Sequence, residues 1–134
     1  MIAKECEILL VEDNPGDVVL LREALDQLGL SVRLYVARDG SEAMDFLRHP
    51  STSHLNAVVL DLNLPVMNGR EVLAEMSADP QLRQVPVAIL TTSTDEADAA
   101  LQFTKERCAF FVKTADMQQF LQTVSDIHAF AKSA

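Results

Sequence analysis

Hydrophobic and polar positions follow two periodicities along the chain, and each predicts a different kind of element. Short apolar runs rich in β-branched residues predict five strands, at 8–11, 32–36, 57–60, 87–90 and 110–112. A longer amphipathic pattern follows each run and predicts five helices, at 15–29, 40–48, 68–77, 94–107 and 116–131. Five such units in succession are typical of a doubly wound α/β fold, in which helices cover both faces of a five-stranded parallel sheet.

The first and last helices carry the clearest signals. Asn14 suits a helix cap, Pro15 suits the first helical position, and Gly29 suits the end of the helix. Spacing near 3.6 residues predicts the buried face of each helix. These faces comprise Val18, Leu21, Leu25 and Leu28 in the first helix and Met117, Phe120, Leu121 and Val124 in the last.

Composition limits the classes of function. A length of 134 residues with 49% hydrophobic content suits one domain over 1–134. A net charge of −9 has the wrong sign for binding a phosphate backbone, so direct nucleic-acid binding is not expected. Because no apolar run approaches the roughly 20 residues of a membrane span and no secretory signal is visible, we expect a cytoplasmic protein without membrane contact. Cys6 and Cys108 lack metal-site spacing and are expected to be free thiols.

Polar residues end four of the predicted strands. Glu12 and Asp13 follow the first, Asp61 the third, Thr91 the fourth and Lys113 the fifth. Open α/β sheets bind ligands at the carboxyl ends of their strands, so these side chains are expected at one edge. Clustered carboxylates repel one another unless a cation joins them, and ligands that are all oxygen favour Mg²⁺.

Each of these residues also has a simpler explanation when taken alone. Glu12 and Asp13 could serve only the first helix, because acidic side chains complement a helix amino terminus. Thr91 could be a turn residue, and Lys113 could be solvated. Their position at one predicted edge favours a shared site, because capping alone does not require that coincidence.

The ordered motifs VED at 11–13, DLNLPVMNG at 61–69, LTTS at 90–93 and FVK at 111–113 resemble those of response-regulator receiver domains. The resemblance implies the flavodoxin-like receiver fold, a phosphoacceptor and Mg²⁺, with a sensor histidine kinase as partner. By this resemblance, Asp61 accepts the phosphoryl group, Thr91 donates a hydrogen bond to it and Lys113 neutralises it. Mg²⁺ is then held by Glu12, Asp13, Asp61 and the backbone carbonyl of Asn63.

The segment EDNPGD at 12–17 further resembles the small regulators paired with bacterial phytochrome kinases, and a non-phytochrome sensor kinase is the alternative. Two positions depart from the usual receiver pattern. Thr92 stands where a smaller residue is usual, which predicts altered access to the phosphorylated aspartate. Thr114 stands where proline is usual, which leaves the geometry of the preceding peptide bond open.

Three other functions share part of this pattern. A phosphatase of the haloacid-dehalogenase type has a second acid two residues after its nucleophile, whereas position 63 is Asn. A dinucleotide-binding protein needs a glycine-rich first turn, and EDNPGD has one glycine. A degenerate receiver would lack part of the acidic set, which is complete here.

Two surfaces are expected to meet partners. Val19 lies opposite the core stripe of the first helix and is predicted to be an exposed contact for the kinase. By the resemblance, Thr91 and Phe110 form a switch. Phe103 and Phe130 lie off the core stripes of their helices, so both are expected to flank Phe110 on one surface. That surface predicts a homodimer whose affinity or geometry changes on phosphorylation.

Overall fold

The computed structural model describes residues 5–49, 54–62, 68–91 and 108–133. The predicted strands are confirmed, and so are the predicted helices within these ranges. The predicted helix at 94–107 lies outside the described residues. In chain order the elements are β1 (Cys6–Val11), α1 (Pro15–Gln27), β2 (Val32–Ala37), α2 (Gly40–Leu47), β3 (Ala57–Asp61), α3 (Gly69–Ala78), β4 (Val87–Thr91), β5 (Cys108–Val112) and α5 (Met117–Ser133).

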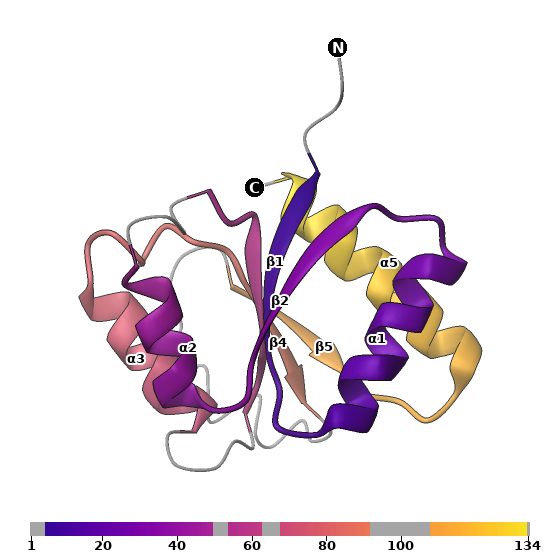
Figure 1. Ribbon diagram of the computed structural model, residues 1–134, viewed down its shortest axis with the longest axis horizontal. Coiled ribbons are helices and arrows are strands. Elements are labelled where there is room, and N and C mark those ends of the chain that lie inside the picture. The colour runs from indigo at the N-terminus through magenta and orange to yellow at the C-terminus, as the bar shows by residue number, and fades with distance from the viewer. Residues whose placement is uncertain (1–4, 50–53, 63–67, 92–107, 134) are drawn as a thin grey trace.

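The five strands form one parallel sheet in the order β2-β1-β3-β4-β5. The chain winds outward from β1 in one direction to β2 and in the other to β3, so the strand order reverses between β1 and β3. Helices α1 and α5 cover one face of the sheet, and α2 and α3 cover the other (Figure 1). The carboxyl ends of β1 and β3 therefore lie side by side at a topological switch point.

Side chains alternate across the sheet and divide the core into two clusters. Leu9, Val58 and Ile89 face α2 and α3, whereas Leu10 and Val59 face α1 and α5. The central strands are buried on both faces, which explains why their sequences are almost continuously apolar.

Local signals begin and end α1 as the sequence predicts. The Asn14 side chain accepts a hydrogen bond from the Gly16 backbone N–H at 2.8 Å, and Pro15 is the first helical residue. Gly29 follows the helix with a φ of 69°, a conformation that glycine adopts without a steric penalty. Both cysteines are free thiols, and the peptide bond between Lys113 and Thr114 is trans.

Two expectations for the last helix were wrong. Met117 is 52% exposed, because as the first residue of α5 it lines an open groove beside α1 rather than the packed interface. Phe130 does not share a surface with Phe110. It packs edge-on against Phe111 at a ring-centroid distance of 6.3 Å, in the cluster under α1 and α5. Phe110 packs against the cluster on the opposite face, because neighbouring residues of a strand point to opposite sides.

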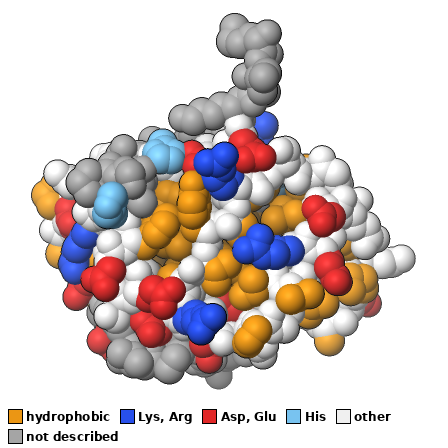
Figure 2. Space-filling model, in the orientation of Figure 1, with side chains coloured by type: hydrophobic (Ala, Val, Ile, Leu, Met, Phe, Trp, Pro, Cys, Tyr) orange, Lys and Arg blue, Asp and Glu red, His pale blue; other side chains and the backbone are white. Residues whose placement is uncertain are grey.

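The surface formed by α2, β2 and α1 is chemically mixed. Figure 2 shows Lys and Arg side chains standing apart from one another there, with acidic and hydrophobic side chains between them. On this face the basic residues form no continuous patch of the kind that follows a nucleic-acid backbone.

Candidate functional site

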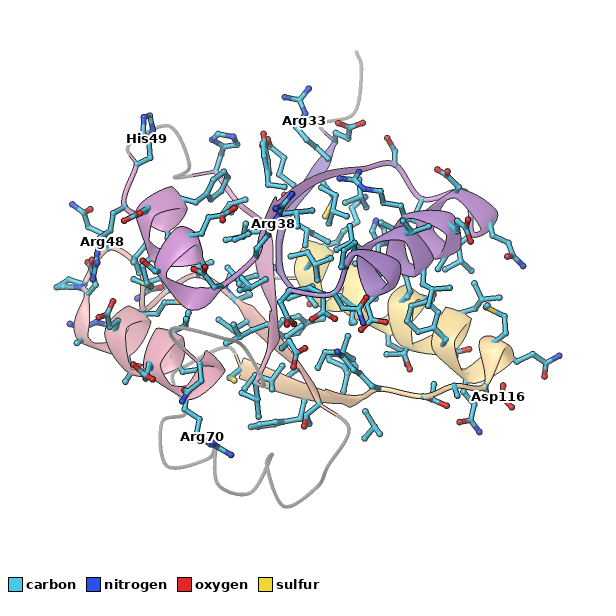
Figure 3. The ribbon with its side chains drawn as sticks, turned by 60° about the horizontal axis from the view of Figure 1, so that its bottom comes forward. Arg33, Arg38, Arg48, His49, Arg70 and Asp116 are labelled. Atoms are coloured by element: carbon cyan, nitrogen blue, oxygen red, sulfur yellow. The ribbon has the colours of Figure 1, made fainter. Side chains whose placement is uncertain are left out.

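Three charged side chains, those of Glu12, Asp61 and Lys113, reach the same corner of the sheet, which we call the ionic corner. Glu12 directly follows β1, Asp61 ends β3, and Lys113 directly follows β5. Leu10, Val59 and Phe111, two positions earlier on each strand, belong to the cluster under α1 and α5. The alternation of side chains therefore turns Glu12, Asp61 and Lys113 toward the face that α1 and α5 cover. The carboxyl-terminal edge comes forward in Figure 3, where Arg70 marks the start of α3 and Asp116 precedes α5.

A single ammonium group joins three carboxylates at this corner. Lys113 Nζ lies 2.9 Å from Glu12 Oε1 and 2.9 Å from Asp61 Oδ2. It also lies 3.5 Å from Asp17 Oδ2, in the first turn of α1. The Glu12 side chain is 4% exposed and that of Asp61 is 11% exposed, whereas that of Asp17 is 42% exposed. The sequence did not identify Asp17, because an acidic residue in a first turn is explained equally well by the helix dipole.

The acidic groups suit a divalent cation. Glu12, Asp13 and Asp61 form an acidic cluster. Each side chain offers a carboxylate oxygen, and these oxygens lie within 4.8 Å of one another. Glu12 Oε2 is buried and has no hydrogen-bond partner among the described residues. A buried acceptor without a partner is costly, and a cation would satisfy it. The residues present therefore fit a metal ion bound through oxygen. Asn63, the other predicted ligand, lies outside the described residues.

Carboxyl groups outnumber the one ammonium group at this corner, and the pKa values of Glu12 and Lys113 respond to that imbalance. Burial, together with the neighbouring carboxyl groups of Asp61 and Asp17, raises the pKa of Glu12 to about 8, although Lys113 acts in the opposite direction. Burial by itself would lower the pKa of Lys113, but hydrogen bonds to Asp61 and Glu12 outweigh it and raise that pKa. The Lys113 ammonium therefore stays charged at neutral pH, while the raised pKa of Glu12 favours the protonated form of that carboxyl group.

A glycine brings α3 close to the end of β3. A Cβ atom at Gly69 would lie 2.6 Å from the backbone oxygen of Asp61 and 2.7 Å from the Cα of Leu62. The Gly69 N–H donates a hydrogen bond to the Leu62 carbonyl at 3.2 Å. Any larger residue would push the backbone at Asp61 away from the start of α3.

Phe110 packs on the other side of the sheet from the ionic corner, and strand alternation directs Thr91 toward the same side. Asp61 is aligned with Leu90 in the parallel register, so Thr91 stands one position further along β4. Thr91 is 2% exposed, and its backbone carbonyl accepts a hydrogen bond from the Lys113 N–H at 2.8 Å. Like Ile89, Thr91 is turned by strand alternation toward the face where Phe110 packs.

A groove of about 560 Å³ opens beside the ionic corner, between α1 and the start of α5. Leu20, Met117 and Phe120 line its apolar part, and Asp17 and Lys113 stand at its polar end. Val19, predicted to be exposed, is 52% exposed on α1. Phe103, the remaining surface residue predicted, lies outside the described residues.

Comparison with known proteins identifies relatives of this chain. The model of the response regulator receiver domain family matches residues 8–125. Response regulator Rcp1 of Synechocystis is 36% identical over 127 residues, which cover 92% of this chain and 86% of Rcp1. A structure of Rcp1 has been solved in its Mn²⁺-bound form, with a TM-score of 0.76, 36% identity and coverage of 93% of both chains.

Two further solved structures are similar over nearly the whole chain. The phosphorylated cyanobacterial phytochrome response regulator RcpA has a TM-score of 0.82 and 37% identity, and the match covers 97% of this chain and 96% of RcpA. The bacteriophytochrome response regulator AtBRR has a TM-score of 0.75 and 38% identity, with 92% and 93% covered. Among the helices that the structure describes, none is long and apolar enough to cross a membrane.

Proposed function

The chain belongs to the response regulator receiver domain family, and on that premise we propose that Asp61 accepts a phosphoryl group from a sensor histidine kinase. The observation that carries this proposal is the position of the Asp61 carboxylate. It lies at the switch-point edge of the sheet, 2.9 Å from the Lys113 ammonium and within the acidic cluster that fits a cation. A largely buried carboxylate with charges of both signs beside it is suited to act as a nucleophile.

Phosphoryl transfer at Asp61 requires one bond to form as another breaks. A carboxylate oxygen of Asp61 attacks phosphorus in line, the bond from phosphorus to the kinase histidine nitrogen breaks, and that nitrogen takes a proton. Glu12, Asp13, Asp61 and, by resemblance, the Asn63 carbonyl would hold Mg²⁺. When bound, Mg²⁺ supplies positive charge to the phosphoryl oxygens.

Lys113 and Thr91 complete the site. The ammonium of Lys113, which stays charged at neutral pH, neutralises one phosphoryl oxygen. The Thr91 hydroxyl moves toward another oxygen and donates a hydrogen bond to it. Because Thr91 shares its side of the sheet with Phe110, this movement changes the packing around Phe110 and carries the signal to the surface. In this proposal the protein catalyses only its own phosphorylation and dephosphorylation, and it signals through protein contacts.

The kinase docks at the groove beside α1. Leu20 lines this groove, its neighbour Val19 is exposed on α1, and Glu12, Asp17 and Lys113 join the groove to the ionic corner. Similarity to RcpA and AtBRR favours a bacterial phytochrome as the kinase, with another sensor kinase as the alternative. Val19→Asp is expected to slow transfer from the kinase more than labelling by a small acyl phosphate. Equal slowing of both reactions would argue against docking through Val19.

A homodimer through the β5 surface remains part of the proposal. Val112, 55% exposed on this edge strand, takes the place of Phe130 as the described apolar contact. Sedimentation of wild type and Val112→Asp, each with and without phosphorylation, tests it. Monomers in all four samples would rule the dimer out.

Labelling with Mg²⁺ and a small acyl-phosphate donor, followed by mass spectrometry of the adduct, tests the acceptor. Asp61→Asn is expected to abolish labelling while the fold is retained. Asp45→Asn, which removes an exposed carboxylate of α2, serves as the control and should be labelled like wild type. Label on Asp61→Asn at the wild-type rate would overturn the assignment.

A further inference from the structure

Asp17 contacts the ionic corner but belongs neither to the acidic cluster nor to the proposed acceptor. Its Oδ2 lies 3.5 Å from Lys113 Nζ. The two partners of Lys113 at 2.9 Å, Glu12 and Asp61, both belong to the cluster that fits a cation. Among the carboxylates described within reach of this ammonium, Asp17 alone is left outside the cluster.

The difference matters once a cation binds. A cation on the acidic cluster would share the charge of Glu12 and Asp61, and these two carboxylates would then hold Lys113 less tightly. The ammonium is a compact charge at the end of a flexible four-carbon chain, so it needs another partner to stay near the phosphoryl group. Asp17 can serve because α1 fixes its backbone. Asn14 Oδ1 accepts hydrogen bonds from the N–H groups of Gly16 at 2.8 Å and Asp17 at 3.4 Å.

We propose that Asp17 is a positioning residue that keeps the Lys113 ammonium beside the phosphoryl site while a cation occupies the acidic cluster. This inference rests on the proposed function. It also makes a prediction opposite to that of simple charge repulsion. If Asp17 acted only as one more negative charge, its removal would speed the approach of an anionic phosphodonor. If Asp17 positions Lys113, its removal slows phosphorylation.

A matched pair of variants separates the two effects. Asp17→Asn removes the contact, and Asp26→Asn removes an exposed charge from the same helix. Asp26 lies nine positions further along, which at roughly 100° per residue is the opposite side of α1. At saturating Mg²⁺ and donor, Asp17→Asn is expected to slow labelling of Asp61 by about threefold to fivefold, the size expected for an exposed ion pair. Asp26→Asn should label at the wild-type rate, and Asp17→Glu, which keeps the carboxylate, should retain most of the rate.

A binding measurement provides a readout that does not depend on turnover. Beryllium trifluoride mimics a phosphoryl group on a carboxylate, and Asp17→Asn is expected to bind it several-fold more weakly in Mg²⁺. Mg²⁺ affinity measured without the mimic should stay at the wild-type value, because Asp17 is not in the cluster. Thermal unfolding checks that all variants are folded.

Labelling of Asp17→Asn at or above the wild-type rate would overturn the positioning role, and so would equal slowing in Asp26→Asn. Both results would leave Asp61 labelled, and the acceptor assignment would stand. Label that persists in Asp61→Asn would instead overturn the proposed function itself.

Discussion

Two glutamates in or next to β1 are almost equally buried, yet their pKa values are shifted in opposite directions. Glu7 is 6% exposed and Glu12 is 4% exposed. Burial raises the pKa of Glu7, but the Tyr35 hydrogen bond and the neighbouring His54 outweigh it, so the pKa is lowered. Burial raises the pKa of Glu12 to about 8, and the nearby Asp61 and Asp17 add to that rise. The partners of a buried carboxylate, rather than its burial, decide which charge state is stable.

The hydrogen-bond and ionic partners of Glu7 and Glu12 also indicate a structural role for Glu7 and a functional role for Glu12. Tyr35 Oη donates to Glu7 Oε1 at 2.9 Å, and His54 Nε2 lies 2.9 Å from Glu7 Oε2. Both oxygens of Glu7 therefore have partners within the fold. Glu12 Oε2 has none among the described residues, and its other oxygen shares one ammonium with Asp61 and Asp17. Glu7 therefore stabilises the fold through contacts within the chain, whereas Glu12 is suited to bind a cation.

Glu12→Gln gives the largest expected effect. The amide removes one charge from the cluster, so Mg²⁺ affinity should fall at least tenfold, to judge from the roughly 10- to 100-fold cost of losing even a group that supports a metal ligand. The free energy of unfolding without metal should stay equal or rise, because the substitution removes one of several carboxyl groups that lie close together. Calorimetric titration and chemical denaturation measure the two quantities. Unchanged Mg²⁺ affinity would show that the two glutamates do not differ in function.

Glu7→Gln should show the reverse pattern. The change weakens two contacts of a buried group, so the free energy of unfolding should fall by about 1–3 kcal/mol while Mg²⁺ affinity stays unchanged. Glu5→Gln is the control, since Glu5 forms an exposed pair with Arg33 at 3.5 Å and should change stability by about 0.5 kcal/mol at most. A Glu7→Gln protein as stable as the control would contradict the structural role.

The two pKa shifts predict opposite pH dependence in the metal-free protein. Glu12 has a folded pKa above its ordinary 4.5, so the folded state binds the extra proton, and stability falls as pH rises from 4.5 to about 8. Glu7 has a folded pKa below its ordinary 4.5, so its contribution is present above that pH and is lost as pH falls through the folded pKa. One proton gives a slope of at most about 1.4 kcal/mol per pH unit.

Denaturation of wild type and Glu12→Gln between pH 5 and pH 9 measures how the free energy of unfolding changes with pH because of Glu12. The wild-type slope should exceed that of the variant, and Mg²⁺ should reduce the difference because binding displaces the proton. Equal slopes in the two proteins would refute the raised pKa of Glu12.

Tyr35→Phe tests one partner of Glu7. The ring keeps its place against Phe46, at a centroid distance of 5.1 Å, while the hydroxyl is lost. We expect a loss of about 1 kcal/mol in stability and a higher pKa of Glu7, seen as unfolding at a higher pH in acid titration. An acid transition at the wild-type pH would show that the hydroxyl does not hold the charge.

His54→Gln should have the smallest effect. The His54 side chain is 40% exposed, so solvent screens its interaction with Glu7 and the loss should be about 0.5 kcal/mol or less. Denaturation at pH 6 and pH 8 measures it. A loss larger than that of Tyr35→Phe would reverse the order of the two partners.

The hydrophobic pattern by itself determined the strands, four of the five predicted helices and the edge where the polar strand ends meet. It could do so because burial on both faces makes a central strand almost continuously apolar, so that a charged residue is expected mainly where the strand leaves the core. Asp61 after Val58, Val59 and Leu60 is such a case. The polar residues at the strand ends then predicted Glu12, Asp13 and Lys113 as neighbours of Asp61, and the structure places these side chains together.

Only the tertiary structure decided which side chains meet across elements. Periodicity placed Met117 in a core stripe and Phe130 on a shared surface with Phe110, but where a helix begins and which sheet face it covers are set by packing. The contact between Asp17 and Lys113 joins residues 96 positions apart. The partners of Glu7, at Tyr35 and His54, lie in separate segments of the chain. A local sequence pattern does not specify such distant partners, because the contacts form only when the sheet and its helices bring the segments together.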